Sequence, residues 1–215
     1  MDRAAFFAAI RAPLFGGHMT QPQVDGMVRI LDYMDAKPVR DVRWQAYMLA
    51  TVLHETGATL QPVTEQGGDA YLRAKPYWPF VGRGLVQITW RRNYATFGKR
   101  LGIDLIGNPD MALTWDVALP VLVIGMSLGL FTGVGLPRYF GARVDDPVQA
   151  RRIVNGMDRA QLVASYHRTF LAALTEAPVA MQPQQLHARP VPVVDDQQGA
   201  ADRLNQQQLD ALHGG

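Results

Sequence analysis

Residues 49–68 read LATVLHETGATLQPVTEQGG, and residues 81–94 read VGRGLVQITWRRNY. The first stretch holds Glu55 and Glu65, the two glutamates of the first 175 residues. Its apolar run ends in HETG, which predicts a buried helix that Gly57 stops and whose last turn brings a carboxylate to the surface. The second carboxylate, beyond a turn-rich segment, can face the first across a cleft. Two carboxylates that face each other are the basic catalytic requirement for hydrolysis of a glycosidic bond.

Composition favours a single packed domain, with an appendage at one end. The chain has 215 residues, of which 48% are hydrophobic, so a sizeable core can form. It has no cysteine, which excludes disulfides and thiolate metal sites. The N-terminus predicts an amphipathic helix and not a signal peptide. The uncharged run 117–137 predicts a buried core helix, with a membrane span as the alternative.

Charge is unevenly distributed along the chain. Residues 1–175 hold 19 Lys/Arg and 14 Asp/Glu, a balance of +5, whereas residues 176–215 hold 2 and 5, a balance of −3. A mildly basic body suits an anionic partner such as cell wall or nucleic acid, although ordinary solvation accounts for it equally well. The sequence shows no Lys/Arg cluster with interleaved aromatics, so we do not expect nucleic acid as a partner.

The body is predicted to be mainly helical. Thr20 and Gln23 resemble a capping box that opens a helix over residues 21–35, and Pro38 fits the first turn of a helix that ends at Glu55. We expect residues 57–84 to form a loop with at most a small hairpin. Three acidic positions are expected to begin further helices, the first of them the long apolar one: Asp110, Asp146 and Asp158. The expected domain is 1–176, followed by a Pro/Gln-rich linker over 177–199 and a short helix over 200–215 that is a candidate docking peptide.

Four motifs carry a resemblance to a known family. LHETG, GRGLVQITWRRNY, GIDLIGNPD and RRIVNG follow one another in an order and spacing that resemble glycoside hydrolase family 19, within residues 4–174. The likeness is to its phage and bacterial endolysin branch, relatives of plant chitinases in the lysozyme-like superfamily. The resemblance implies a mainly α, lysozyme-like fold: a helical bundle with a catalytic cleft.

The resemblance also implies roles for individual residues. Glu55 corresponds to the general acid and Glu65 to the base that activates water. Gln87 and Thr89 match positions that hold the substrate and the attacking water. Asn93 matches a sugar-binding asparagine, and Asn155 one that reaches into the cleft from a later helix.

Several assignments stay open at the level of sequence. Asp69 is an alternative base, because the sixteen residues between Glu65 and Gly82 are fewer than that branch usually carries, and a shorter wall leaves a more open cleft. Tyr71, Tyr77 and Trp78 either stack on sugar faces or pack in the loop. Arg83 is expected to organise its turn, and His54 to be packed and not catalytic. No residue spacing fits a metal site or a phosphate loop, so no cofactor is expected.

The function predicted is a peptidoglycan-degrading glycosidase with an inverting mechanism, and chitin is the lesser substrate. Lytic transglycosylase is the rival within the same superfamily. The rival from another class is a phage tail or wall-binding structural module, held to a particle through residues 200–215. We expect synthesis in a bacterial cytoplasm without a signal peptide, and access to the wall by holin-type release or on a virion.

Overall fold

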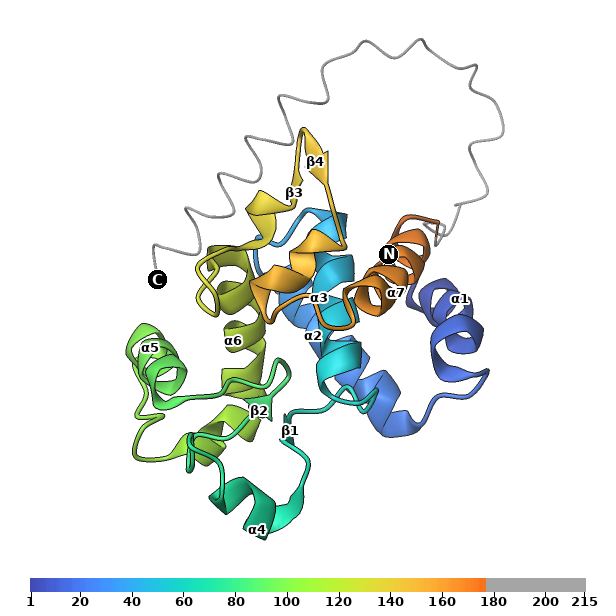
Figure 1. The fold of residues 1–215 in the computed structure, drawn as a ribbon. Helices are drawn as coiled ribbons and strands as arrows, with labels where there is room; N and C mark the ends of the chain where they lie inside the picture. Colours follow the sequence, from blue (N-terminus) through green and yellow to red (C-terminus); the bar gives the residue numbers. More distant parts are fainter. Residues whose placement is uncertain (177–215) are drawn as a thin grey trace, which may run out of the picture.

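The computed structural model describes residues 1–176, so the predicted linker 177–199 and terminal helix 200–215 lie outside the described part of the chain (Figure 1). The described residues are mainly helical, as the sequence predicted. The α-helices are α1 Arg3–Phe15, α2 Gln21–Ala36, α3 Val42–Glu55, α4 Gly68–Arg73, α5 Arg91–Leu101, α6 Trp115–Leu128 and α7 Ala160–Glu176. Short 3₁₀ helices are η1 Pro109–Leu113, η2 Leu136–Arg138 and η3 Gln149–Ile153. The strands are β1 Val63–Thr64, β2 Arg83–Gly84, β3 Phe140–Gly141 and β4 Val144–Asp145.

Side-chain caps fix where the first helices begin. The predicted capping box at the start of α2 is confirmed: Thr20 accepts from the Gln23 backbone, and the Gln23 side chain accepts from the Thr20 backbone. The prediction for Pro38 is wrong. Asp41 caps α3 by accepting from the Arg43 N–H at 2.9 Å, so the helix begins at Val42, four residues after the proline.

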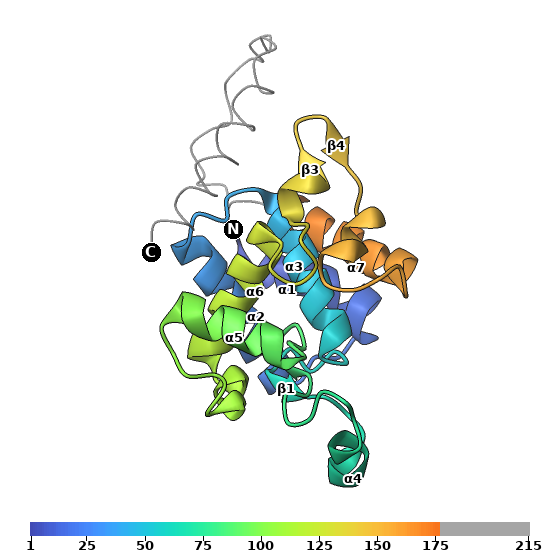
Figure 2. The same cartoon turned by 60° about the vertical axis from the view of Figure 1, so that its left-hand side comes forward.

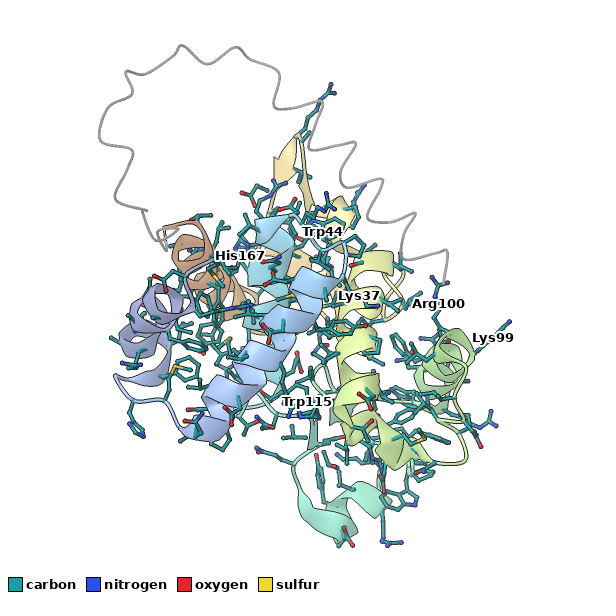
Figure 3. The ribbon with its side chains drawn as sticks, turned by 180° about the vertical axis from the view of Figure 1, so that it is seen from behind. Lys37, Trp44, Lys99, Arg100, Trp115 and His167 are labelled. Carbon is teal, nitrogen blue, oxygen red and sulfur yellow. The ribbon has the colours of Figure 1, made fainter. Side chains whose placement is uncertain are left out.

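Helix α3 is the centre of the core. Figure 1 shows it between α6 on one side and α7 and α1 on the other, and nine of its fourteen residues are buried. Trp44 is fully buried and its indole N–H donates to the Phe140 carbonyl at 3.2 Å, which ties α3 to β3. Trp44 and His167 are labelled in Figure 3 on neighbouring elements of this core. The helix that presents Glu55 is therefore supported along its length.

The long apolar helix α6 is a buried core helix, as predicted. No helix among residues 1–176 is both long and apolar enough to cross a membrane. The prediction that Asp110 caps α6 is wrong, because α6 follows Thr114 and Asp110 lies in η1. The Asp110 carboxylate instead pairs with the Arg83 guanidinium at 2.8 Å. That ion pair links η1 to the strand β2.

Residues 57–84 contain the predicted small hairpin and one helix that the sequence did not predict. Strand β1 pairs antiparallel with β2, with Val63 opposite Gly84. Between them the chain forms α4, which projects from the body in Figure 2. The expected helix starts are confirmed in part: Asp146 accepts from the Gln149 N–H at 3.0 Å to begin the 3₁₀ helix η3, and α7 begins two residues after Asp158.

Candidate active site

A cleft of about 820 Å³ opens beside the β1–β2 hairpin. It is lined by the end of α3, by the segment around β1, by the passage from β2 into α5, and by the residues after η3. Six of the eight predicted site residues line it, and they are Glu55, Glu65, Gln87, Thr89, Asn93 and Asn155. The fold therefore brings both glutamates to one cleft, Glu55 from the end of α3 and Glu65 from the residue after β1.

Glu55 is the last residue of α3, where the sequence placed it. Its Oε1 accepts from the Arg151 guanidinium at 2.6 Å, and the two side chains are only 15% and 3% exposed. The Arg151 Nε donates to the Asp158 carbonyl at 3.0 Å, which fixes the guanidinium. Gly57, with φ of 57°, adopts the left-handed conformation expected of the residue that ends the helix. Arg151 is a site residue that sequence reasoning missed.

Glu65 follows β1 and is held by three hydrogen bonds. Its backbone N–H donates to the Gly82 carbonyl at 2.7 Å. Its Oε1 accepts from the Tyr77 hydroxyl at 2.8 Å, and its Oε2 accepts from the Gly82 N–H at 3.1 Å. Burial and the hydrogen bond to Glu65 raise the pKa of Tyr77 to about 12, so Tyr77 is a donor at neutral pH. The carboxylate is thus fixed in a single orientation.

Asp69, the alternative base, lies in the first turn of α4 on an exposed surface. It is not among the residues that line the cleft. Between the two candidates that the sequence left open, the geometry favours Glu65.

Gly82 is the position where the backbone approaches Glu65 most closely. A Cβ there would lie 3.3 Å from Glu65 Cβ and 2.8 Å from Gln87 Oε1. Any side chain would therefore displace one of these cleft residues. Glycine is required at this position because neighbouring side chains come too close for a Cβ, and not because of backbone conformation, since the φ of Gly82 is not in the left-handed region.

The polar cleft residues use their donors within the protein. The Gln87 amide donates to the carbonyls of Val63 and Gly84 at 2.9 and 3.1 Å, and the Asn93 amide donates to the Thr89 carbonyl at 2.9 Å. Gln87 thus offers its amide oxygen to a ligand, and Asn93 offers its amide oxygen and its second N–H. Asn155 is oriented the other way, because its Oδ1 accepts from the Gly156 N–H at 2.8 Å and its amide nitrogen is offered.

The passage from β2 to α5 contains two non-glycine residues in the left-handed region. They are Gln87, with φ of 53°, and Trp90, with φ of 73°. Such conformations cost on the order of 1–3 kcal/mol each and persist only where the surroundings enforce them. Here the Gln87 amide is tied to β1 and β2, and the Trp90 N–H donates to the Phe80 carbonyl at 2.9 Å.

Arg83 organises this wall, as predicted, and does not line the cleft. Its side chain is 8% exposed. It donates to the Pro79 carbonyl and to the Tyr94 hydroxyl, both at 3.0 Å, and pairs with Asp110. Burial raises the pKa of Tyr94 to about 12, against the opposing effect of Arg83, so Tyr94 stays a neutral partner. The arginine thereby joins the hairpin, α5 and η1.

The predicted stacking residues Tyr71 and Trp78 are not among the residues that line the cleft. Both belong to the segment that α4 winds away from the body. Tyr71 packs over Gly67 and beside Lys75, and Arg73 lies over Trp78. The aromatic residues at the cleft are Tyr77 and Trp90, whose rings meet edge-on with centroids 5.2 Å apart.

Two further observations describe the titratable residues at and around the cleft. His54 lines it, and burial lowers the pKa of this imidazole, so it is neutral near pH 7. Within residues 1–176, no group of three or more His, Asp or Glu side chains is arranged to hold a metal ion.

Comparison with known proteins places this geometry in context. No family model matches the chain. A stretch of 61 residues is 38% identical to "Endochitinase CH5B" of Phaseolus vulgaris, covering 26% of this chain and 19% of that protein. A stretch of 55 residues is 42% identical to "Chitinase 3" of Oryza sativa subsp. japonica, covering 22% and 17%. The matched stretch thus spans about a fifth of the length of these curated relatives.

Among solved structures, chitinase C from Streptomyces griseus superposes with a TM-score of 0.52 at 21% identity, over 82% of this chain and 75% of that one. At this identity the likeness shows the fold alone. The predicted fold class is confirmed: the mainly helical fold of this chain is shared with a chitinase.

Proposed function

We propose that this chain is a glycoside hydrolase, as its resemblance to glycoside hydrolase family 19 implies; the fold that it shares with a chitinase and the stretch of 61 residues that is 38% identical to an endochitinase support the proposal. It cleaves β-1,4 bonds between N-acetylated amino sugars, with peptidoglycan as its first substrate and chitin as its second. The observation that carries the proposal is that Glu55 and Glu65 line one cleft. The curated relatives, which are named chitinases, support the prediction of a glycosidase.

The proposed mechanism is inverting. Glu55 protonates the leaving oxygen while Glu65 activates a water on the opposite face of the sugar, which requires carboxyl groups roughly 6.5–9.5 Å apart. Arg151 contacts Glu55 at Oε1, so Oε2 is the oxygen left to carry the transferred proton. Tyr77 and the Gly82 N–H hold Glu65 from two sides, which directs the carboxylate at a single water position.

The polar wall supplies contacts to the sugar and to the water. The amide oxygens of Gln87 and Asn93 accept from hydroxyl or N-acetyl N–H groups, and the Asn155 amide donates to a sugar oxygen. The Thr89 hydroxyl donates to the Gln87 carbonyl at 2.9 Å and retains lone pairs for a water proton. These groups are fixed by the protein before substrate arrives, which reduces the entropy cost of orienting it.

Two other activities remain candidates. A lytic transglycosylase uses one acid/base and releases an anhydro-sugar without water. A non-catalytic module is supported by a third relative, "Inactive chitinase-like protein 1" of Hevea brasiliensis, which is 37% identical over 51 residues. The proposed setting is a bacterial cell wall, reached by holin-type release or on a phage particle.

The test is mass spectrometry of soluble fragments from purified peptidoglycan and from chitin, treated with wild type, Glu55→Gln and Glu65→Gln. We expect reducing-end products from wild type and their loss in both variants. Anhydro products that survive Glu65→Gln would assign a transglycosylase. An absence of fragments from wild type on both polymers would leave the binding module as the function.

A further inference from the structure

Positive charge is concentrated next to the cleft. Residues 66–92, from the end of the β1 loop to the first turn of α5, contain five Lys/Arg and one acidic residue, Asp69. Their balance of +4 is most of the +5 carried by residues 1–175. These cations do not form a run in the sequence, because they are spread over twenty positions. All of them belong to the segment that leaves β1, forms α4 and returns through β2 to the start of α5.

Four of these five cations have no acidic partner. Arg83 pairs with Asp110, whereas the described residues form no ion pair with the other four, which are Arg73, Lys75, Arg91 and Arg92. Three of the four are exposed, and Lys75 is partly buried. Unneutralised cations on an exposed surface attract an anionic ligand, and the attraction weakens as salt increases.

Aromatic side chains accompany the free cations. Within residues 1–176, the exposed aromatic residues are Tyr71, Trp78 and Trp90, and all three belong to this segment. Lys75 Nζ lies 3.7 Å from the centre of the Tyr71 ring, and Arg73 Cζ lies 4.9 Å from that of Trp78. Each cation is therefore held beside an aromatic ring and does not extend freely into solvent. We call the four free cations and these three aromatic residues the basic aromatic wall.

The wall is continuous with the cleft. Trp90 lines the cleft and, with Arg91 and Arg92, also lines a second hollow of about 390 Å³. The Trp90 ring contacts Tyr77, whose hydroxyl holds Glu65. A polymer whose scissile bond lies between the glutamates can therefore extend past Trp90 onto the wall.

We propose that the basic aromatic wall binds the carboxylates of the peptide stems of peptidoglycan while the glycan strand occupies the cleft. This inference rests on the proposed function and adds the basis of its substrate choice. Peptidoglycan carries a carboxylate-bearing peptide on alternate sugars, whereas chitin has the same type of glycosidic bond and no anionic group. Ion pairs between those carboxylates and the arginine and lysine side chains of the wall would make peptidoglycan bind more tightly than chitin. The aromatic rings of the wall suit the apolar faces of the sugars.

The experiment compares two variants that remove the same charge. The wall variant is Arg73→Gln/Lys75→Gln/Arg91→Gln/Arg92→Gln. The control variant is Arg11→Gln/Arg40→Gln/Lys99→Gln/Arg143→Gln, which also removes three arginines and one lysine, all of them exposed and outside the segment. Figure 3 shows Lys99 on the outer side of α5. Both sets are built on Glu55→Gln, so that co-sedimentation with purified sacculi or chitin measures binding without turnover, and thermal unfolding verifies the fold of each.

We expect the wall variant to lose at least about tenfold in affinity for sacculi relative to chitin, and the control variant to keep the parent ratio. Sacculi whose carboxyls have been amidated should bind the parent as weakly as native sacculi bind the wall variant. Equal losses in both variants would overturn the inference, as would equal affinity for a single-stranded DNA oligonucleotide. Binding is read without hydrolysis, so failure of the proposed activity is distinguished from failure of the wall.

Discussion

The carboxylate of Glu55 and the guanidinium of Arg151 form a 2.6 Å ion pair between the end of α3 and η3. Both side chains are largely buried, and neither has another charged partner among residues 1–176. The proposed acid is therefore kept in place by a residue ninety-six positions away in the sequence.

Breaking this pair should destabilise the fold. We expect Arg151→Met to lower the free energy of unfolding by about 3–5 kcal/mol, because it leaves the Glu55 carboxylate buried without a counter-charge. Urea denaturation measures this loss. In Glu55→Gln/Arg151→Met no charge is stranded, so the double variant should recover much of the stability. Additive losses in the double-mutant cycle would show that the two residues do not stabilise each other.

Tyr77 should act as a positioning residue for Glu65. Tyr77→Phe removes the hydroxyl that donates to Oε1 at 2.8 Å, and a hydrogen bond to a charged group contributes about 1.5–3 kcal/mol. We expect kcat to fall by roughly tenfold to a hundredfold, with a smaller change in KM. Tyr33→Phe is the matched control, since it removes a hydroxyl from α2, outside both the cleft and the basic aromatic wall. An equal effect of the two variants would contradict the assignment.

Close packing at Gly82 should also be required for activity. In Gly82→Ala the added Cβ must displace Gln87 Oε1 or Glu65, and a displacement of about 1 Å in a site can cost about a hundredfold in rate. Gly156→Ala adds the same methyl group beside Asn155, where it meets nothing within 4 Å. Initial rates on soluble peptidoglycan fragments compare the two. Full activity of Gly82→Ala would mean that Glu65 needs no fixed position.

His167 should make stability depend on pH. Burial between Tyr47 and Phe140 lowers its pKa from 6.5 to about 4, so the folded protein favours the neutral imidazole. The resulting stability is fully present above pH 6.5 and is lost as pH falls from 6.5 to 4, a change of about 3 kcal/mol. In His167→Phe, the free energy of unfolding should therefore fall by about 3 kcal/mol less between pH 7 and pH 4 than it does in the wild type, as measured by urea denaturation. The matched variant of the exposed His18, His18→Phe, should behave as wild type.

Local signals in the sequence predicted the helical part of the site well. The end of α3 at Glu55 follows from an apolar run closed by glycine, and the start of α2 follows from a capping box. Both features depend on residues within a few positions of each other. The predicted start of α3 was wrong because both Pro38 and Asp41 are residue types that begin helices. The hydrogen bond from the Arg43 N–H to the Asp41 carboxylate places the start after Asp41.

The remaining errors concern contacts between distant residues. Nothing in RRIVNG distinguishes the buried Arg151 from its exposed neighbour Arg152. The role of Arg151 depends on its contact with Glu55 at the end of α3, which is far away in the sequence. Asp110 was expected to cap a helix, and its partner Arg83 comes from the hairpin. The position of Tyr71 and Trp78 outside the cleft lining could not be predicted, because the helix α4 in this segment was not predicted.

The two proposed catalytic carboxylates belong to different structural units. Glu55 and its arginine lie with α3, α7 and η3, whereas Glu65 and its hydrogen-bond donors belong to the hairpin wall that Arg83 fastens to α5 and η1. The gap between acid and base is therefore set by how the end of α3 packs against this wall, and side chains from both sides belong to one hydrophobic core. In the proposed mechanism, a substitution far from the cleft that shifts this packing would change the separation of the two carboxylates, on which the stereochemical outcome depends.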